Sequence, residues 1–177
     1  MTDADGTALT VNELVTAYLE NQDLEHLARL RSAVAGSPSF DPELNLVAEV
    51  GPLVEQGRHQ EVVDAVTARM PGAALNPTAH MALSMALEGL GREDAAKRES
   101  LMVKVAVSSV LSTGDGTEAS PWSVLRVADE YDVMRAQEIT PRGQSSLTVD
   151  GRLVDRHETA DGGEVWFVLD RPRAPVP

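Results

Sequence analysis

The sequence predicts an α+β protein, in which N-terminal helical hairpins of tetratricopeptide-like length are followed by a small C-terminal antiparallel β-sheet. Up to Leu111, apolar residues recur at the three-to-four-residue spacing of helices. Beyond Asp115 they alternate or run together, as they do in strands. The two glycines around Asp115 mark the change. At 177 residues without a cysteine, the chain is long enough for a core that needs no disulfides.

The helical part is predicted to span residues 10–111, after a small polar stretch, 1–9, that we expect to be frayed. Thr10 and Glu13 form a capping-box pattern, in which each side chain can bond a free backbone N–H at the start of a helix. A second helix is predicted to end at Gly36.

Two further helix starts are predicted at Asp41-Pro42 and Asn76-Pro77. In each pair the first residue can cap free backbone amides, and proline fits the first turn without losing a hydrogen bond. Gly51-Pro52 lies inside an apolar helical pattern, so we expect a kink or a break there.

A dipeptide repeats at the predicted turns between helices. Gly57-Arg58 and Gly91-Arg92 lie 34 positions apart, which is the period of tetratricopeptide repeats. Two helix hairpins of equal length could stack in register and bury each other's open faces. The alternative is a helical bundle whose loops happen to be alike.

The C-terminal part, 112–172, is predicted to be rich in strands, with a proline-broken tail at 173–177. Val124–Val127 suits a strand, Asp129–Met134 suits either a helical turn or a loop, and Thr140–Gly143 suits a turn.

Two hairpins are predicted after this segment. Asp150-Gly151 is a strong two-residue hairpin signal, and it places Leu147 opposite Val154 on one face of a sheet. A second turn lies at 161–163. The strand that follows, Val165–Leu169, is continuously apolar, so we expect it to be buried on both faces.

Several C-terminal motifs resemble one family. They are Thr113-Gly114-Asp115-Gly116, Pro121-Trp122, Val127–Tyr131, Gly143-Gln144-Ser145 and Trp166–Pro172, in this order. Together they are similar to the bacterial domain-of-unknown-function family 4919. The resemblance covers roughly the last two-thirds of the chain, and implies a tetratricopeptide-like helical part with a C-terminal segment. The family has no activity to transfer.

The candidate binding residues come from these motifs: Asp115, Asp129, Glu130, Tyr131 and Gln144. Clustered carboxylates can bind a divalent cation or perform acid–base chemistry. A structural interpretation competes with this one, because Asp in a Gly-Asp-Gly turn bonds its own backbone and Asp129 suits a helix cap.

The few aromatic residues offer a further interpretation of the C-terminal motifs. Four of them could form a joint between the helices and the sheet: Trp122, Tyr131, Trp166 and Phe167. In that case the motifs would hold the fold together and would have no ligand.

Charge and motifs restrict the possible functions. The net charge of −13 disfavours nucleic-acid and anionic-membrane partners and is compatible with a basic one. No histidine pair has helical metal-ligand spacing, and nucleotide-binding and nucleophile-elbow motifs are missing, so no catalytic residue, metal or cofactor is predicted. Without a signal-peptide pattern, a cytoplasmic protein is expected.

The leading hypothesis is therefore a non-enzymatic module that binds a protein or peptide segment, because stacked hairpins expose a concave surface. Methionines usually fill gaps in cores, so we expect Met81, Met85 and Met102 to be core residues; the alternative is a soft groove for peptides. The alternative function is an enzyme or a small-ligand or metal sensor that uses the Gly-Asp-Gly loop with Asp129, Glu130 and Tyr131.

Overall fold

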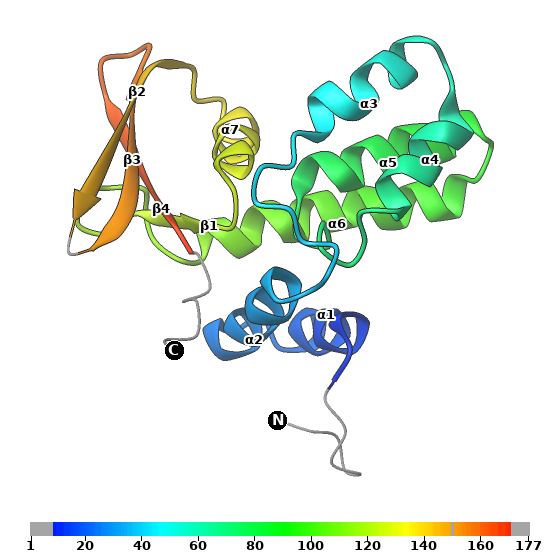
Figure 1. The fold of residues 1–177 in the computed structure, drawn as a ribbon, viewed down its shortest axis with the longest axis horizontal. Coiled ribbons are helices and arrows are strands. Elements are labelled where there is room, and N and C mark those ends of the chain that lie inside the picture. Colours follow the sequence, from blue (N-terminus) through cyan, green and yellow to red (C-terminus); the bar gives the residue numbers. More distant parts are fainter. Residues whose placement is uncertain (1–8, 150, 171–177) are drawn as a thin grey trace.

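The computed structural model of the chain describes residues 9–149 and 151–170, and within them it confirms the α+β class (Figure 1). The helical part contains α1 (Val11–Glu20), α2 (Leu24–Ala35), α3 (Leu46–Glu55), α4 (His59–Thr67), α5 (Pro77–Gly89) and α6 (Glu93–Leu111). After it come β1 (Trp122–Val124), α7 (Val127–Ala136), β2 (Pro141–Val149), β3 (Arg152–Thr159) and β4 (Glu164–Leu169). None of the described helices has the length and apolarity that crossing a membrane requires.

The predicted cap at the first helix is confirmed. The Thr10 hydroxyl accepts a hydrogen bond from the Glu13 backbone N–H, and Glu13 accepts one from the Thr10 N–H at 2.7 Å. Of the stretch expected to be frayed, only Leu9 lies within the described residues, and it packs against the core of α1 and α2. The tail predicted at 173–177 lies outside them.

The helix start predicted at Asp41-Pro42 is wrong, whereas the one at Asn76-Pro77 is confirmed. Asp41 bonds the Glu43 N–H in a local turn, and α3 begins only at Leu46, capped by Asn45. An aspartate followed by proline suits a turn as well as a helix start. Here the Asp41 side chain forms its hydrogen bond within the turn and does not cap a helix. Of the kink or break expected at Gly51-Pro52, the break is absent, because α3 continues through Pro52.

The repeated dipeptide corresponds to a repeated turn. Gly57 and Gly91 both have positive φ, 66° and 71°. In each turn the N–H of the following arginine bonds a carbonyl five residues back, Leu53 or Leu87. This is the helix-ending arrangement in which glycine is favoured. The 34-residue offset therefore relates the α3–α4 hairpin to the α5–α6 hairpin, which share one apolar core.

The first hairpin packs elsewhere. The core of α1 and α2 includes Ala74 and Leu75 from the connection before α5, and Leu125 from the C-terminal part. In Figure 1 this hairpin lies below α5 and α6, away from α3 and α4. Its position ties the beginning of the chain to the segment after β1.

The sheet is mixed, so its predicted antiparallel arrangement is wrong in one pairing. The strand order is β1-β4-β3-β2, and β1 runs parallel to β4, with Trp122 beside Phe167. Helix α7, β2 and β3 separate β1 from β4 in the chain, which gives the long connection that parallel strands need. The other two pairings are antiparallel.

The predicted register of the first hairpin is confirmed, with Leu147 opposite Val154. Its turn residue Asp150 lies outside the described residues. Two local predictions are wrong: the strand expected at Val124–Val127 ends at Val124 because α7 begins at Val127, and the turn expected at Thr140–Gly143 is the beginning of β2.

Strand β4 is buried on both faces, as predicted. Phe167 lies in a core with Val110 of α6 and Val133 of α7, while Val168 and Trp166 lie in a separate cluster on the other face. A loop that includes Ala119 and Pro121 lies over this second face. Trp166 is therefore buried, but away from the face that meets the helices.

Candidate functional site

Helix α7 carries three of the candidate residues and connects the sheet to the other helices. Asp129 and Asp132, three residues apart, bond α5, whereas Glu130 and Tyr131 bond β3 and β2. Because of helical spacing, Asp129 and Asp132 lie on one side of α7, and Glu130 and Tyr131 lie on the side that faces the sheet. Figure 1 shows α7 between the sheet and α3.

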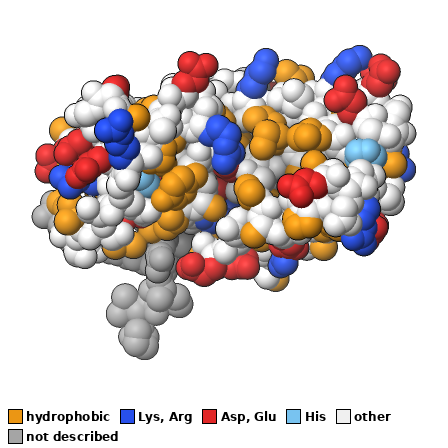
Figure 2. Space-filling model, turned by 90° about the horizontal axis from the view of Figure 1, so that it is seen from above, with side chains coloured by type: hydrophobic (Ala, Val, Ile, Leu, Met, Phe, Trp, Pro, Cys, Tyr) orange, Lys and Arg blue, Asp and Glu red, His pale blue; other side chains and the backbone are white. Residues whose placement is uncertain are grey.

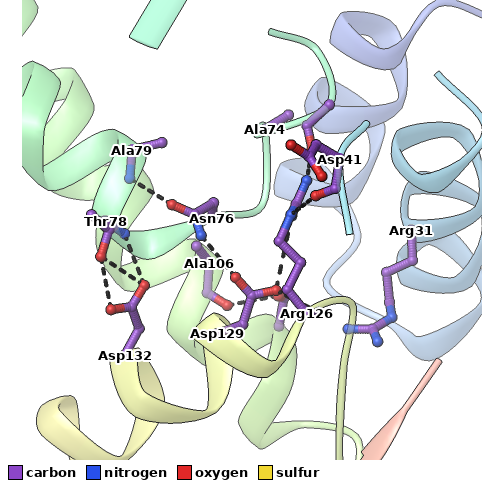
Figure 3. A network of polar contacts seen from close by, with 12 residues as sticks. Arg31, Asp41, Ala74, Asn76, Thr78, Ala79, Ala106, Arg126, Asp129 and Asp132 are labelled. Atoms are coloured by element: carbon purple, nitrogen blue, oxygen red, sulfur yellow. Dashed lines mark hydrogen bonds and ion pairs between the residues drawn. The ribbon is translucent and has the colours of Figure 1, made fainter. Parts of the chain in front are cut away.

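Asp129 is the cap of its own helix and a partner of another cap. Its Oδ2 accepts a hydrogen bond from the Arg126 backbone N–H at 3.1 Å, and its Oδ1 accepts one from Asn76 Nδ2 at 2.8 Å. The side-chain oxygen Oδ1 of Asn76 in turn accepts a hydrogen bond from the Ala79 N–H (Figure 3). Burial raises the pKa of Asp129 to about 6, although Arg126 acts in the opposite direction. Each oxygen of the carboxylate therefore accepts one structural hydrogen bond.

Asp132 holds the first turn of α5. It accepts hydrogen bonds from the Thr78 backbone N–H at 3.2 Å and from the Thr78 hydroxyl at 2.7 Å (Figure 3). Arg135 donates a third bond to it at 2.9 Å. A carboxylate at a helix N-terminus is favourable because the free backbone amides and the helix dipole attract negative charge.

Arg126 is the largest fully buried side chain in the described part of the chain. Its Nε donates to the Asp41 carbonyl at 2.7 Å, and its Nη2 donates to the Gly72 carbonyl at 2.6 Å. The guanidinium also lies 4.3 Å from the centre of the Phe40 ring, within the range of a cation–π contact. One side chain therefore connects the start of α7 to two interhelical loops.

A second buried arginine connects a helix to the sheet. Arg31 of α2 donates to the Ser123 hydroxyl at 3.0 Å and to Asp170 at 3.3 Å. These partners belong to β1 and to the end of β4, so α2 is tied to both parallel strands.

Glu130 faces the sheet and is completely buried, as is His157 of β3. Glu130 Oε2 lies 2.7 Å from His157 Nε2. Burial raises the pKa of Glu130 to about 7; the bond to His157 opposes the rise, and the nearby Asp155 carboxylate adds to it. The three groups form a buried titratable cluster, none of whose members lines a described cavity.

Tyr131 covers this cluster. Its hydroxyl donates to Gln144 Oε1 of β2 at 2.7 Å, and its ring meets the His157 ring edge-on at 5.3 Å. His157 also contacts Phe167. The cross-strand neighbour of His157 on β4 is Val165.

Asp115 lies apart from the α7 residues. Its carboxylate accepts bonds from the backbone N–H and the hydroxyl of Thr117, which lower its pKa, so it forms the local turn that Gly-Asp-Gly sequences favour. The loop lines a cavity of about 460 Å³ together with the end of α7 and the β3–β4 turn. Four carboxylates contribute to that lining: Asp115, Glu138, Asp161 and Glu164.

Four of the five predicted site residues thus meet in one region, but as separate structural contacts. Asp129 contacts α5, while Glu130, Tyr131 and Gln144 lie at the sheet, and Asp115 belongs to another loop. The prediction missed Asp132 and the buried Arg126, Asp155 and His157. Asp155 and His157 lie two positions apart on β3. Side chains with this spacing lie on the same face of a strand, so the sequence did contain a signal that the two residues are neighbours.

A small groove of about 140 Å³ lies where α3, α5 and α7 meet. It is lined in part by Val47, Thr78, Tyr131 and Arg135. Figure 2, which looks down on α3 and α7, shows hydrophobic side chains gathered across the middle of this face.

The methionines of α5 are not the core residues that the sequence led us to expect. Met81 and Met85 are 39% and 50% exposed, and Val47 on α3 is 55% exposed. Met81 and Met85 follow Thr78 along one stripe of α5 at helical spacing, so they extend away from the groove of α3, α5 and α7.

Comparison with known proteins found no matching family model, no matching curated protein and no matching solved structure. In the described residues, no group of three or more His, Asp or Glu side chains could hold a metal ion.

Proposed function

We propose that the protein is a non-enzymatic interaction module that binds a peptide segment of another protein along α5, next to the groove of α3, α5 and α7. The exposure of Met81, Met85 and Val47 carries this proposal. These side chains lie on the first helices of two hairpins with the same turn, where a stacked array presents its binding surface. Flexible, polarisable methionines suit a surface that must adapt to a partner.

The chemistry of the candidate acids supports a binding role over catalysis. A general acid or base must reach a substrate within hydrogen-bond distance. Asp129 and Glu130 are buried and bonded to Asn76 and His157, and Asp115 bonds its own loop. Each acid therefore has a structural partner. The family resemblance assigns no activity and does not alter this choice.

Charge selects the kind of partner. The chain carries a net charge of −13, and Glu88 follows Met85 on the exposed stripe of α5. An apolar contact beside acidic groups favours a segment that combines apolar anchors with Lys or Arg, because opposite charge speeds encounter and rejects acidic competitors.

Affinity capture with matched variants tests the proposal. The wild type should retain a stoichiometric protein from extracts of the source cells, and M81Q/M85Q should lose it while its circular dichroism is unchanged. L101Q is the control, because Leu101 is 60% exposed on a different helix, α6. Equal capture by M81Q/M85Q, or no stoichiometric partner in repeated captures, would contradict the proposal.

A second candidate function is a sensor of a small organic cation in the cavity beside the Gly-Asp-Gly loop. The specific observation is that four carboxylates and the Trp122 side chain line about 460 Å³, with no Lys, Arg or His among the described lining residues. Carboxylates and an aromatic face both attract cations. Thermal shift with spermidine, with Ca²⁺ and with Mg²⁺ tests it: stabilisation by spermidine that E138Q weakens supports the sensor, and no stabilisation rejects it.

A further inference from the structure

Strand β2 forms the open edge of the sheet. The order β1-β4-β3-β2 leaves one side of β2 without a neighbouring strand in the described structure, over the nine residues Pro141–Val149. The opposite edge strand, β1, has three residues and is contacted by α6 and α7. An edge of this length presents a row of backbone donors and acceptors that another strand can pair with.

This edge lacks the features that usually prevent pairing. Charged residues, proline and bulges protect exposed edges in most proteins. In β2 they occur only at the beginning, where the register shifts between Pro141 and Gly143, at Arg142. The remaining stretch, Gly143–Val149, contains no charged residue and no proline, although charged residues make up 24% of the chain. Leu147 and Val149 on this stretch are 41% and 46% exposed.

We propose that β2 pairs antiparallel with β2 of a second copy of this chain, about a two-fold axis near Ser146, so that the two sheets become continuous. The charge distribution selects this occupant. The stretch Gly143–Val149 contains no carboxylate that could attract a basic peptide. A second copy of the chain contributes a strand that is equally uncharged. Two chains of net charge −13 can approach most closely where neither carries charge.

The side chains of the stretch are compatible with this register. Ser145 of one copy lies opposite Leu147 of the other, and Gly143 lies opposite Val149, so no two bulky side chains collide. The two Leu147 side chains are diagonal neighbours on the same face, where long side chains still reach each other. Leu147 shares that face with Val154, its partner on β3.

The symmetry closes the assembly at two copies. A two-fold contact uses the same edge on both chains, and β1 offers no second long edge, so the pairing does not propagate into fibres. A contact made of one strand pair is small, and we expect a dimer that dissociates on dilution.

Sedimentation equilibrium with two matched variants tests the proposal, over about 1 μM to about 1 mM, the range of weak association. The wild-type mass should rise from 18.9 kDa towards twice that value. L147K should remain monomeric, because two lysines then face each other near the axis. L101K makes the same change of residue and charge on α6 and should dimerise like the wild type.

Hydrogen exchange on the wild type gives an independent readout. Amides of Gly143–Val149 should exchange more slowly at the high concentration than at the low one. A wild type that stays monomeric throughout overturns the proposal, even if the edge accepts a strand from a different protein. Dimerisation of L147K equal to that of L101K also overturns it, as does exchange at β2 that is independent of concentration.

Discussion

Replacing Glu130 by glutamine should remove a large part of the pH dependence of stability. Glutamine keeps the shape of the side chain and can still accept a hydrogen bond from His157, but it does not ionise. Glu130 is fully buried beside Asp155, so the folded protein favours its protonated form. The substitution therefore tests ionisation with little change in packing.

The magnitude follows from the pKa. Burial raises the pKa of Glu130 from 4.5 to about 7, and one pKa unit corresponds to about 1.4 kcal/mol. Because the folded-state pKa is the higher one, the folded chain binds more protons than the unfolded chain between these values. The contribution of Glu130 is complete below about pH 4.5 and is lost as the pH rises through about 7. Between pH 5 and pH 8 the loss is about 2–3 kcal/mol.

Urea denaturation at several pH values from 5 to 8 provides the measurement. The free energy of unfolding of E130Q minus that of the wild type should rise by about 2–3 kcal/mol across this range. D129N is the matched control: the pKa of Asp129 is about 6, so its contribution is mostly lost by pH 7 and its difference curve levels off earlier. A difference between E130Q and the wild type that stays constant from pH 5 to pH 8 would refute the reasoning.

Four further substitutions test the backbone and the core by denaturation. Glu138 has φ 57°, a conformation that glycine adopts without strain, so E138G should stabilise the protein by about 0.5–1 kcal/mol; a loss would contradict this. A Cβ on Gly72 would collide with the Ser39 backbone, whereas one on Gly51 meets nothing, so G72A should cost about 1–3 kcal/mol and G51A should be neutral or stabilising. Trp166 is buried in its own cluster, and W166A should cost about 3–5 kcal/mol; unchanged stability would show that the cluster contributes little.

The sequence predicted those features that depend on residues close together in the chain. The Thr10 and Asn76 caps and the Gly57 and Gly91 turns are set by interactions within about five positions. The register of β2 and β3 follows from one short turn and an alternating pattern. These signals specify one local structure each, whereas Asp41-Pro42 suits both a helix start and a turn, and there the prediction was wrong.

The missed features join distant parts of the chain. Arg126 reaches the Asp41 carbonyl across 85 positions, and His157 reaches Glu130 across 27. A buried arginine has no sequence signature, because the same residue is usually exposed. The parallel pairing of β1 depends on where α6 delivers the chain to the sheet, which no local pattern near Trp122 records.

The candidate site shows the same limit in chemical terms. Asp129 and Glu130 were found because acids cluster there, yet an acid that caps a helix and an acid that binds a ligand look alike in sequence. Only their partners, Asn76 and His157, distinguish the two. The exposure of Met81 likewise depends on tertiary packing. Helical spacing shows which face of α5 the methionine lies on, but not whether another element packs against that face.

The buried arginine of α2 has a consequence for how the chain folds during synthesis. Arg31 is made early, but its partners Ser123 and Asp170 are translated about 90 and 140 residues later, and Leu125 completes the core of α1 and α2. The first hairpin therefore leaves the ribosome before its packing partners exist. Its final packing waits until Asp170 has emerged, so the first hairpin and the sheet acquire their stability together.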